Sequence, residues 1–151
     1  MTEADWQGCD DIWTIMRWIS AAGSPDAHRR LACEFARLVW KELPPIGQSA
    51  LIEAEKLANG ESDEETCEHY QRQLQEVLSE ENESEPISTV IWALQQHSSS
   101  YPTWYSASLV GSNIIELEAA GGAELCQIVR RAFSYETAKS SQDEKDITSR
   151  G

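Results

Sequence analysis

The chain has 151 residues, 40% of them hydrophobic, which is enough for one ordinary domain with its own core. Its 26 Asp and Glu outnumber its 12 Lys and Arg, giving a formal net charge of −14. A chain this acidic repels nucleic-acid backbones and anionic lipid, so we expect neither a nucleic-acid partner nor a membrane partner. No stretch approaches the roughly 20 apolar residues that span a bilayer, and the first ten residues are polar, which favours a cytoplasmic protein.

The N-terminal part of the chain contains several residues that are typical of helix starts. The segment from Thr2 to Asp5 resembles a capping box. Asp10 or Asp11 can cap a second helix that runs to about Ala22. Gly23-Ser24-Pro25 ends that helix and begins the next one, because Gly suits a helix end and Pro suits a first turn.

The helix predicted over residues 25–43 is the most informative segment. Its narrow polar stripe consists of Arg30, Glu34, Arg37 and Lys41, and apolar side chains cover most of the remaining surface. A helix with this pattern is typical of the centre of a bundle, where it has neighbours on several sides. Pro44-Pro45 then ends it.

Five more helices are predicted after the double proline. They cover residues 46–59, 62–78, 86–97, 102–120 and 123–135. Ser62 is placed to cap the second of them. Gly111 lies inside the fourth, where it indicates either a break or a close helix contact, and the sequence does not decide between the two.

Two segments lack the apolar residues that a packed element needs. Residues 79–86 are rich in Glu and are predicted to be a flexible linker inside the domain. Residues 137–151 contain one strongly apolar residue, Ile147, and are predicted to be a disordered tail after a domain of residues 1–136. No segment alternates polar and apolar residues as a strand does. We therefore predict an all-α fold, a compact bundle of six to eight helices without a sheet.

The residues that could carry chemistry lack the spacing that catalysis or metal binding requires. The four cysteines, Cys9, Cys33, Cys67 and Cys126, contain no close pair, so we expect buried, reduced thiols rather than zinc ligands. His69 falls on the opposite side of its helix from Cys67. No nucleophile elbow and no phosphate-binding loop occurs. We predict no catalytic residue, no metal and no cofactor.

Several segments resemble a known group of proteins. Residues 2–6 (Thr-Glu-Ala-Asp-Trp) and 30–40 (Arg-Leu-Ala-Cys-Glu-Phe-Ala-Arg-Leu-Val-Trp) are similar to an uncharacterised bacterial family, expanded in planctomycetes. That family opens with T-E-A-E-W and carries an R-L-x-A-C-x-x-x-R-x-x-W helix. Residues 54–60 resemble its A-E-x-x-A-D-G motif, and residues 126–133 resemble its C-terminal motif but lack the N-P-F. The resemblance implies a helical fold and a cytosolic bacterial origin, and it brings no activity.

Six tryptophans are more than a chain of this length usually carries. Trp6, Trp13 and Trp40 fit the buried faces of their helices. Trp18 lies at the edge of its helix's apolar stripe, and Trp92 lies off its stripe. Either could anchor a protein partner, because interfaces favour Trp, or could pack against a second helix.

Charge is distributed unevenly along the chain, and this favours binding of a protein. Residues 53–85 contain twelve acids and two bases, a field that steers a basic partner. We therefore predict a protein-interaction module whose candidate partner-binding residues are Trp18, Trp92, Glu61, Glu64, Glu65 and Glu68; a homo-oligomer is also compatible with this. The alternatives are a small enzyme or ligand-binding domain, which a deep pocket with convergent His and acids would support, and an acidic inhibitor that mimics nucleic acid, which a regular ridge of acids would support.

Overall fold

The structure is a computed structural model that describes residues 1–81 and 85–150, with side chains for residues 1–78 and 86–142. Within these ranges the chain forms nine α-helices, one 3-10 helix and no strand, which confirms the predicted all-α fold. The elements in chain order are α1 (Glu3–Gly8), α2 (Ile12–Trp18), α3 (Pro25–Arg37), η1 (Trp40–Glu42), α4 (Pro45–Ala58), α5 (Glu64–Glu81), α6 (Glu85–Leu94), α7 (Thr103–Glu116), α8 (Gly122–Ala132) and α9 (Tyr135–Arg150).

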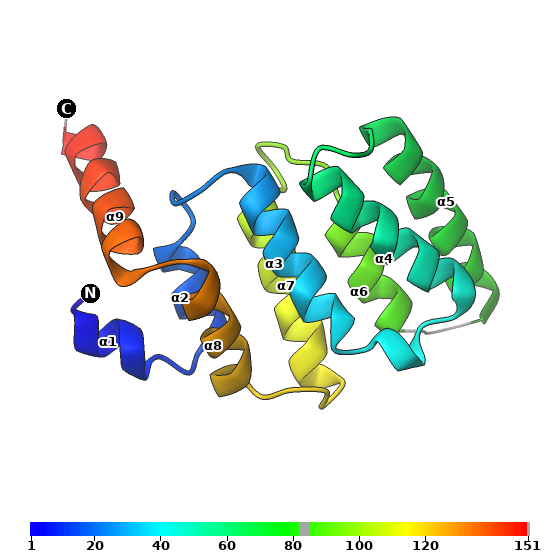
Figure 1. The fold of residues 1–151 in the computed structure, drawn as a ribbon, viewed down its shortest axis with the longest axis horizontal. Helices are drawn as coiled ribbons and strands as arrows, with labels where there is room; N and C mark the ends of the chain where they lie inside the picture. The colour runs from blue at the N-terminus through cyan, green and yellow to red at the C-terminus, as the bar shows by residue number, and fades with distance from the viewer. Residues whose placement is uncertain (82–84, 151) are drawn as a thin grey trace.

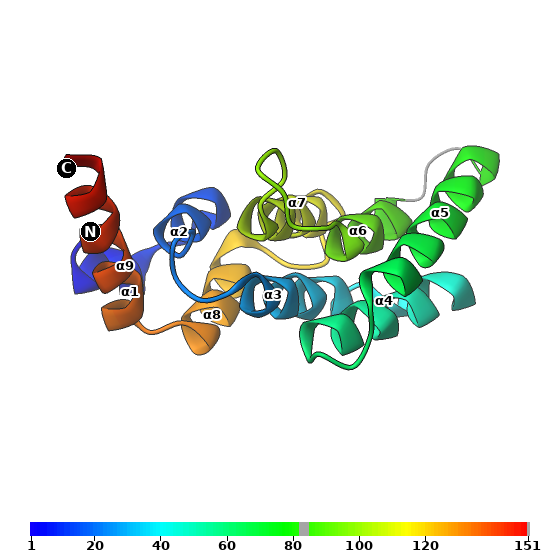
Figure 2. The ribbon, with the colours of Figure 1, turned by 90° about the horizontal axis from the view of Figure 1, so that it is seen from above.

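The helices form an elongated bundle of two layers (Figure 1). Figure 2 shows α8, α3 and α4 in one layer and α2, α7 and α6 in the other. Helix α5 closes one end of the bundle, and α1, α9 and both termini lie at the opposite end. Helix α3 contacts α4, α6, α7 and α8, so the prediction that it is the central helix is confirmed.

The first helices begin where their capping residues predict. The Thr2 hydroxyl accepts a hydrogen bond from the Asp5 backbone N–H at 3.1 Å, and the Asp5 carboxylate accepts one from the Thr2 N–H at 2.8 Å. This is the reciprocal pair of a capping box. The Asp11 carboxylate accepts from the Thr14 N–H at 2.9 Å, and the Ser24 hydroxyl caps α3 in the same way.

Three helices approach one another closely in the core where α2, α3 and α7 meet. Phe35 of α3 and Ile12 of α2 are buried there against Gly111 of α7. A Cβ atom added to Gly111 would lie 3.0 Å from Ile12 Cγ1 and 3.4 Å from the Phe35 ring. Because α7 runs without a break through this position, Gly111 permits close helix contact and does not interrupt the helix.

Most of the predicted linker, residues 79–86, is helical in the structure. Helix α5 continues to Glu81 and α6 begins at Glu85, whereas the sequence predicted a flexible segment over residues 79–86. Glu is a good helix former, and no Gly or Pro occurs in α5, so the helix has no local reason to end earlier. Pro86 lies in the first turn of α6, where it is tolerated. Residues 82–84 lie outside the described residues.

The C-terminal segment differs most from its prediction. A disordered tail was expected over residues 137–151, but residues 137–150 belong to α9, which raises the helix count of the described residues above the predicted six to eight. Ala138 is fully buried, and the Gln142 side chain donates to the backbone carbonyls of Arg17 and Trp18, each at 3.2 Å. The prediction is wrong for residues 137–142, because a small side chain and one amide suffice to dock this helix on the carbonyls that end α2.

Candidate functional site

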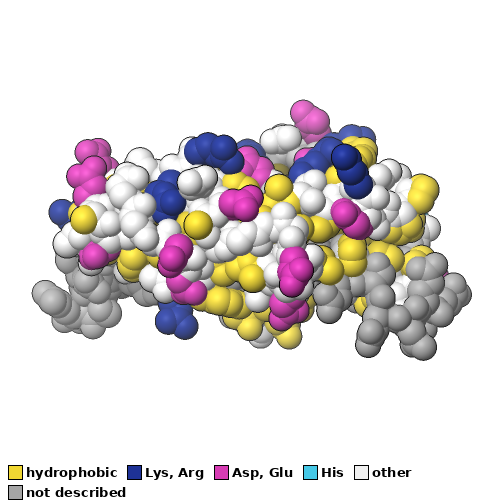
Figure 3. All heavy atoms as spheres, turned by 90° about the horizontal axis from the view of Figure 1, so that it is seen from below, with side chains coloured by type: hydrophobic (Ala, Val, Ile, Leu, Met, Phe, Trp, Pro, Cys, Tyr) yellow, Lys and Arg dark blue, Asp and Glu magenta, His cyan; other side chains and the backbone are white. Residues whose placement is uncertain are grey.

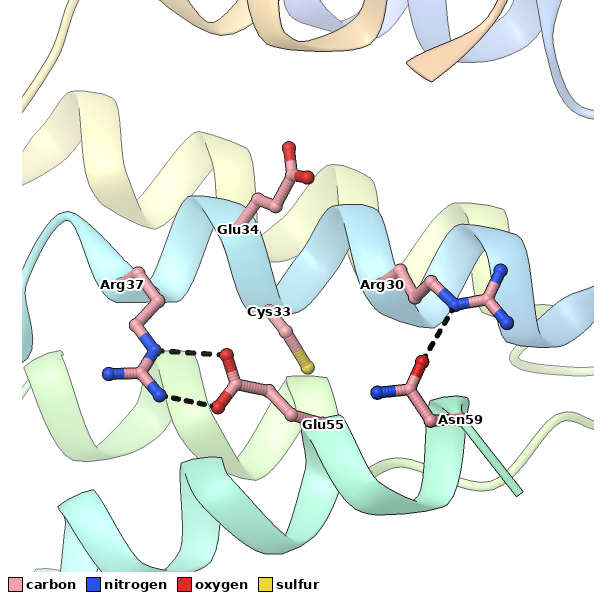
Figure 4. Close-up of a pocket in the computed structure, with 6 residues that line it drawn as sticks. All are labelled: Arg30, Cys33, Glu34, Arg37, Glu55 and Asn59. Atoms are coloured by element: carbon pink, nitrogen blue, oxygen red, sulfur yellow. Dashed lines mark hydrogen bonds and ion pairs between the residues drawn. The ribbon is translucent and has the colours of Figure 1, made fainter. Parts of the chain in front are cut away.

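A recess of about 200 Å³ lies between α3 and α4 (Figure 4). Six polar residues line it: Arg30, Cys33, Glu34, Arg37, Glu55 and Asn59. At one end Arg37 donates to both carboxylate oxygens of Glu55, at 2.9 and 2.6 Å. At the other end Arg30 Nε donates to the Asn59 amide oxygen at 3.2 Å. The charged groups of the recess are thus largely used to join its two helices.

Trp40 makes a further contact with the ion pair of Arg37 and Glu55. The Arg37 guanidinium lies over the Trp40 ring, 4.2 Å from its centroid, a favourable cation–π arrangement. Its hydrogen bonds to Glu55 raise the pKa of Arg37 further above its usual range. Both side chains are therefore held in one geometry, as expected of a tie between helices.

Cys33 lines the recess, and its thiol is unreactive. Figure 4 shows its thiol between Glu55 and Asn59. Burial, with a further contribution from the nearby Glu55 carboxylate, raises the pKa of Cys33 to about 12. The thiol is therefore protonated at neutral pH and is a poor nucleophile. The lining of this recess contains no histidine, so it lacks the convergent His and acid groups that would favour an enzyme.

A continuous run of aromatic rings crosses α6, α7 and α2. Trp92 of α6 packs against Tyr101, which precedes α7, with ring centroids 5.6 Å apart. Tyr101 packs against Tyr105 at 6.4 Å, and Tyr105 packs against Trp13 of α2 at 5.9 Å and against Trp104 at 6.0 Å. We call these five residues the aromatic surface.

The aromatic surface remains accessible to solvent. Four of its residues are half-buried, and Tyr101 is 42% exposed, the most exposed large hydrophobic side chain that the structure describes. A single half-exposed Trp or Tyr is ordinary in a folded protein. A row of rings that stays partly uncovered is typical of a binding surface.

The loop between α6 and α7 holds Tyr101 in this position. The Tyr101 N–H donates to the Ser98 hydroxyl at 3.0 Å, and the Ser98 N–H donates back to the Tyr101 carbonyl at 3.2 Å. The Thr103 N–H donates to His97 Nδ1 at 3.1 Å, at the start of α7. Since that donor occupies the Nδ1 lone pair, the neutral imidazole carries its proton on Nε2. The loop is therefore fixed by short local hydrogen bonds.

The predicted acidic residues lie at the start of α5. All four are exposed, and with the neighbouring Asp63 they form what we call the acidic edge: Glu61, Asp63, Glu64, Glu65 and Glu68. Asp63 caps α5, because its carboxylate accepts from the Thr66 N–H at 2.7 Å, and this hydrogen bond lowers the pKa of Asp63. Asp63 is therefore ionised at neutral pH.

The acidic edge adjoins the helix that carries Trp92. Just beyond the end of α6, the Gln96 amide donates to the Glu68 carboxylate at 2.5 Å. The Gln71 amide of α5 donates to the Gln95 side chain at 3.1 Å. The structure thus brings two of the predicted partner-binding residues, Trp92 and Glu68, onto neighbouring helices.

Trp18 lies apart from this region. It is half-buried at the end of α2, and its ring packs against Trp6 with centroids 6.4 Å apart. Its carbonyl is one of the acceptors that dock Gln142 of α9. A shallow groove beside it is lined partly by Asp5, Asp10 and Asp11. Because this residue anchors helices at the terminal end of the bundle, we do not include it in the aromatic surface.

Sequence reasoning missed most of the aromatic surface. It placed Trp13 in the core, although the structure leaves that ring half-buried, and it singled out neither Tyr101 nor Tyr105. One local signal was present. Tyr101, Trp104 and Tyr105 fall within five residues just after a serine-rich loop, a density of aromatic residues that indicates a surface feature.

Acidic side chains are dispersed on the face shown in Figure 3. There Asp and Glu stand apart, with hydrophobic, Lys and Arg side chains between them. A mimic of nucleic acid needs closely and regularly spaced negative charges, because a duplex carries one charge per about 1.7 Å. This face does not provide such a row.

In the part of the chain that the structure describes, no three or more His, Cys, Asp and Glu side chains group closely enough to bind a metal ion. No described helix combines the length and the apolar character needed to cross a bilayer. Comparisons with protein-family models, with curated proteins and with solved structures found no match. The resemblance to the bacterial family stays a prediction.

Proposed function

We propose that this protein is an interaction module that binds a basic protein partner on the aromatic surface, beside the acidic edge. The observation that carries the proposal is the run of five linked, partly exposed rings that ends at Trp92 and Tyr101. Trp and Tyr supply large contact areas at low entropic cost, and they dominate the binding energy of many interfaces.

The chemistry of the partner follows from the groups beside the rings. The acidic edge attracts a basic segment over a Debye length of about 8 Å at physiological salt, which acts mainly on the association rate. Arg or Lys side chains of that segment can then stack on the exposed rings, each contributing about 0.5–1 kcal/mol at exposed sites. The rings set the lifetime of the complex, and the acids set the rate at which it forms.

Affinity capture with four immobilised proteins tests the role of the rings. Tyr101→Ala and Trp92→Ala remove exposed parts of the aromatic surface, and Ile52→Ala is the matched control, since Ile52 is 40% exposed on α4, outside that surface. A partner should be retained from a lysate by the unmodified protein and by the control, and lost with either aromatic variant. Equal retention by all four proteins would contradict the proposal.

The role of the acids is tested separately, by kinetics with the captured partner. Reversing Glu61, Glu64, Glu65 and Glu68 to Lys should slow association at low salt by at least about tenfold, with little effect at high salt. An unchanged association rate would limit the acidic edge to keeping the protein soluble.

A further inference from the structure

The turn between α1 and α2 runs directly across one face of α8. Gly122, Cys126 and Arg130 follow at intervals of four residues and so share that face. A Cβ atom on Gly122 would collide with the carbonyl oxygen of Asp10. At the other end of the face, Arg130 Nη1 donates to the carbonyl of Cys9 at 2.8 Å. Residues 9 and 10 are therefore pressed against the stretch of α8 that contains Cys126.

Two free thiols meet in this contact. Cys126 is fully buried on the face of α8 between Gly122 and Arg130, the two residues that meet residues 9 and 10, so it lies beside Cys9. Cys9 is half-buried and lines the shallow groove between α1 and α2. Its S–H also donates to the Asp11 carbonyl at 3.5 Å. The Cys9 thiol is thus accessible to solutes, whereas the Cys126 thiol is buried.

We propose that Cys9 and Cys126 form a redox-sensitive pair that a hydroperoxide converts into an intramolecular disulfide. The Cys9 sulfur attacks one peroxide oxygen, the O–O bond breaks, and Cys9 becomes a sulfenic acid as the first water leaves. The Cys126 sulfur then attacks the Cys9 sulfur, and the S–O bond breaks. The hydroxyl leaves with the Cys126 proton as a second water, so two thiols have given up two electrons and two protons to hydrogen peroxide.

The two cysteines have different roles because their surroundings differ. Burial, with a contribution from the neighbouring Cys9, raises the pKa of Cys126 to about 12, and this thiol does not meet the oxidant itself. It acts as the resolving thiol, and because it is protonated at neutral pH, its attack on the adjacent sulfur is the slow step of disulfide formation. Cys33 and Cys67 provide the contrast: both are at least 98% buried, so neither is open to a peroxide.

Mass spectrometry of the whole chain after treatment with hydrogen peroxide tests this proposal. The number of thiols open to alkylation after unfolding should fall from the four of the sequence to two. Peptide mapping should find Cys9 linked to Cys126, and a dithiol reductant should restore all four. Cys9→Ser should abolish the link, and Cys126→Ser should leave a sulfenic acid on Cys9 that a sulfenate-specific probe traps.

Two further variants serve as controls for this experiment. Cys67→Ser is the matched control and should form the disulfide at the rate of the unmodified chain. Cys126→Ala provides a second variant without the resolving thiol if the serine disturbs the core. Three results would overturn the proposal: all four thiols surviving peroxide, Cys9 passing to sulfinic acid while Cys126 stays free, or Cys9 linking only to Cys9 of a second molecule.

Discussion

Helices α2 and α7 present large apolar side chains on two sides, and the two sides are packed differently. On the inner side, Ile12 and Gly111 close around Phe35 of α3. On the outer side, Trp13 and Tyr105 contact each other but remain half-buried. The same pair of helices thus supplies both the core and the aromatic surface. The difference implies that substitutions on the inner side act on stability, whereas those on the outer side act on binding.

Removing the ring of Phe35 should produce the largest effect. Phe35 is fully buried on the central helix, and truncation of such a residue leaves a cavity that costs about 3–5 kcal/mol. We expect Phe35→Ala to lower the free energy of unfolding by this amount in urea titrations followed by circular dichroism. A loss below about 1 kcal/mol would show that the inner side is no better packed than the outer one.

Adding one methyl group at Gly111 should have the next largest effect. The new Cβ atom would lie 3.0 Å from Ile12 Cγ1, and overpacking of this kind costs about 1–3 kcal/mol. Gly8→Ala is the control, because nothing lies within 4 Å of a Cβ at Gly8; there we expect a gain of up to about 1 kcal/mol. If both substitutions stabilised the protein, the close contact of α2 with α7 would be refuted.

The pH dependence of stability should reveal another buried group on the inner side. His28 Nε2 lies 3.1 Å from the Ile19 carbonyl, and burial lowers the pKa of His28 below its ordinary value of 6.5. The unfolded chain therefore takes up the proton first as pH falls. The free energy of unfolding should decline below about pH 6.5 and level off below the folded-state pKa. His28→Gln should flatten this decline, while Gln at the exposed His69 should leave it unchanged.

The smallest effect on stability should come from the outer side. Tyr101 is 42% exposed, so Tyr101→Ala should cost at most about 1 kcal/mol for the lost ring contacts. The same substitution should abolish retention of the partner. Thermal melts and capture measured on one protein preparation make the comparison direct. A Tyr101 variant that unfolds as readily as the Phe35 variant would assign this ring to the core.

Local signals were enough to predict where the first three helices begin. Thr2, Asp11 and Ser24 each cap a helix through a contact within three residues, which a sequence displays directly. The prediction erred by one position at α5, where Asp63 and not Ser62 accepts the capping bond, because both residue types can do so. It failed at α9, where docking depends on a distant helix.

The sites depended on contacts that no local pattern encodes. Trp92 was found because it lies off its helix's stripe, but its link to Trp13 through two tyrosines arises only when α2 and α6 pack on α7. Cys9 comes to lie beside Cys126 only when the segment between α1 and α2 lies against α8. Periodicity places a residue on a face of its own helix and does not say which helix will cover that face.

The hydrogen bonds of Arg130 also constrain the order in which the chain becomes structured. This side chain holds the carbonyls of Trp6 and Cys9, and Cys9 precedes it by 121 residues. Helix α1 has six residues, too few to persist alone in water. During synthesis the first segment made is therefore among the last to settle. A product cut short before α8 lacks both hydrogen bonds, so nothing from Arg130 fixes its first helix.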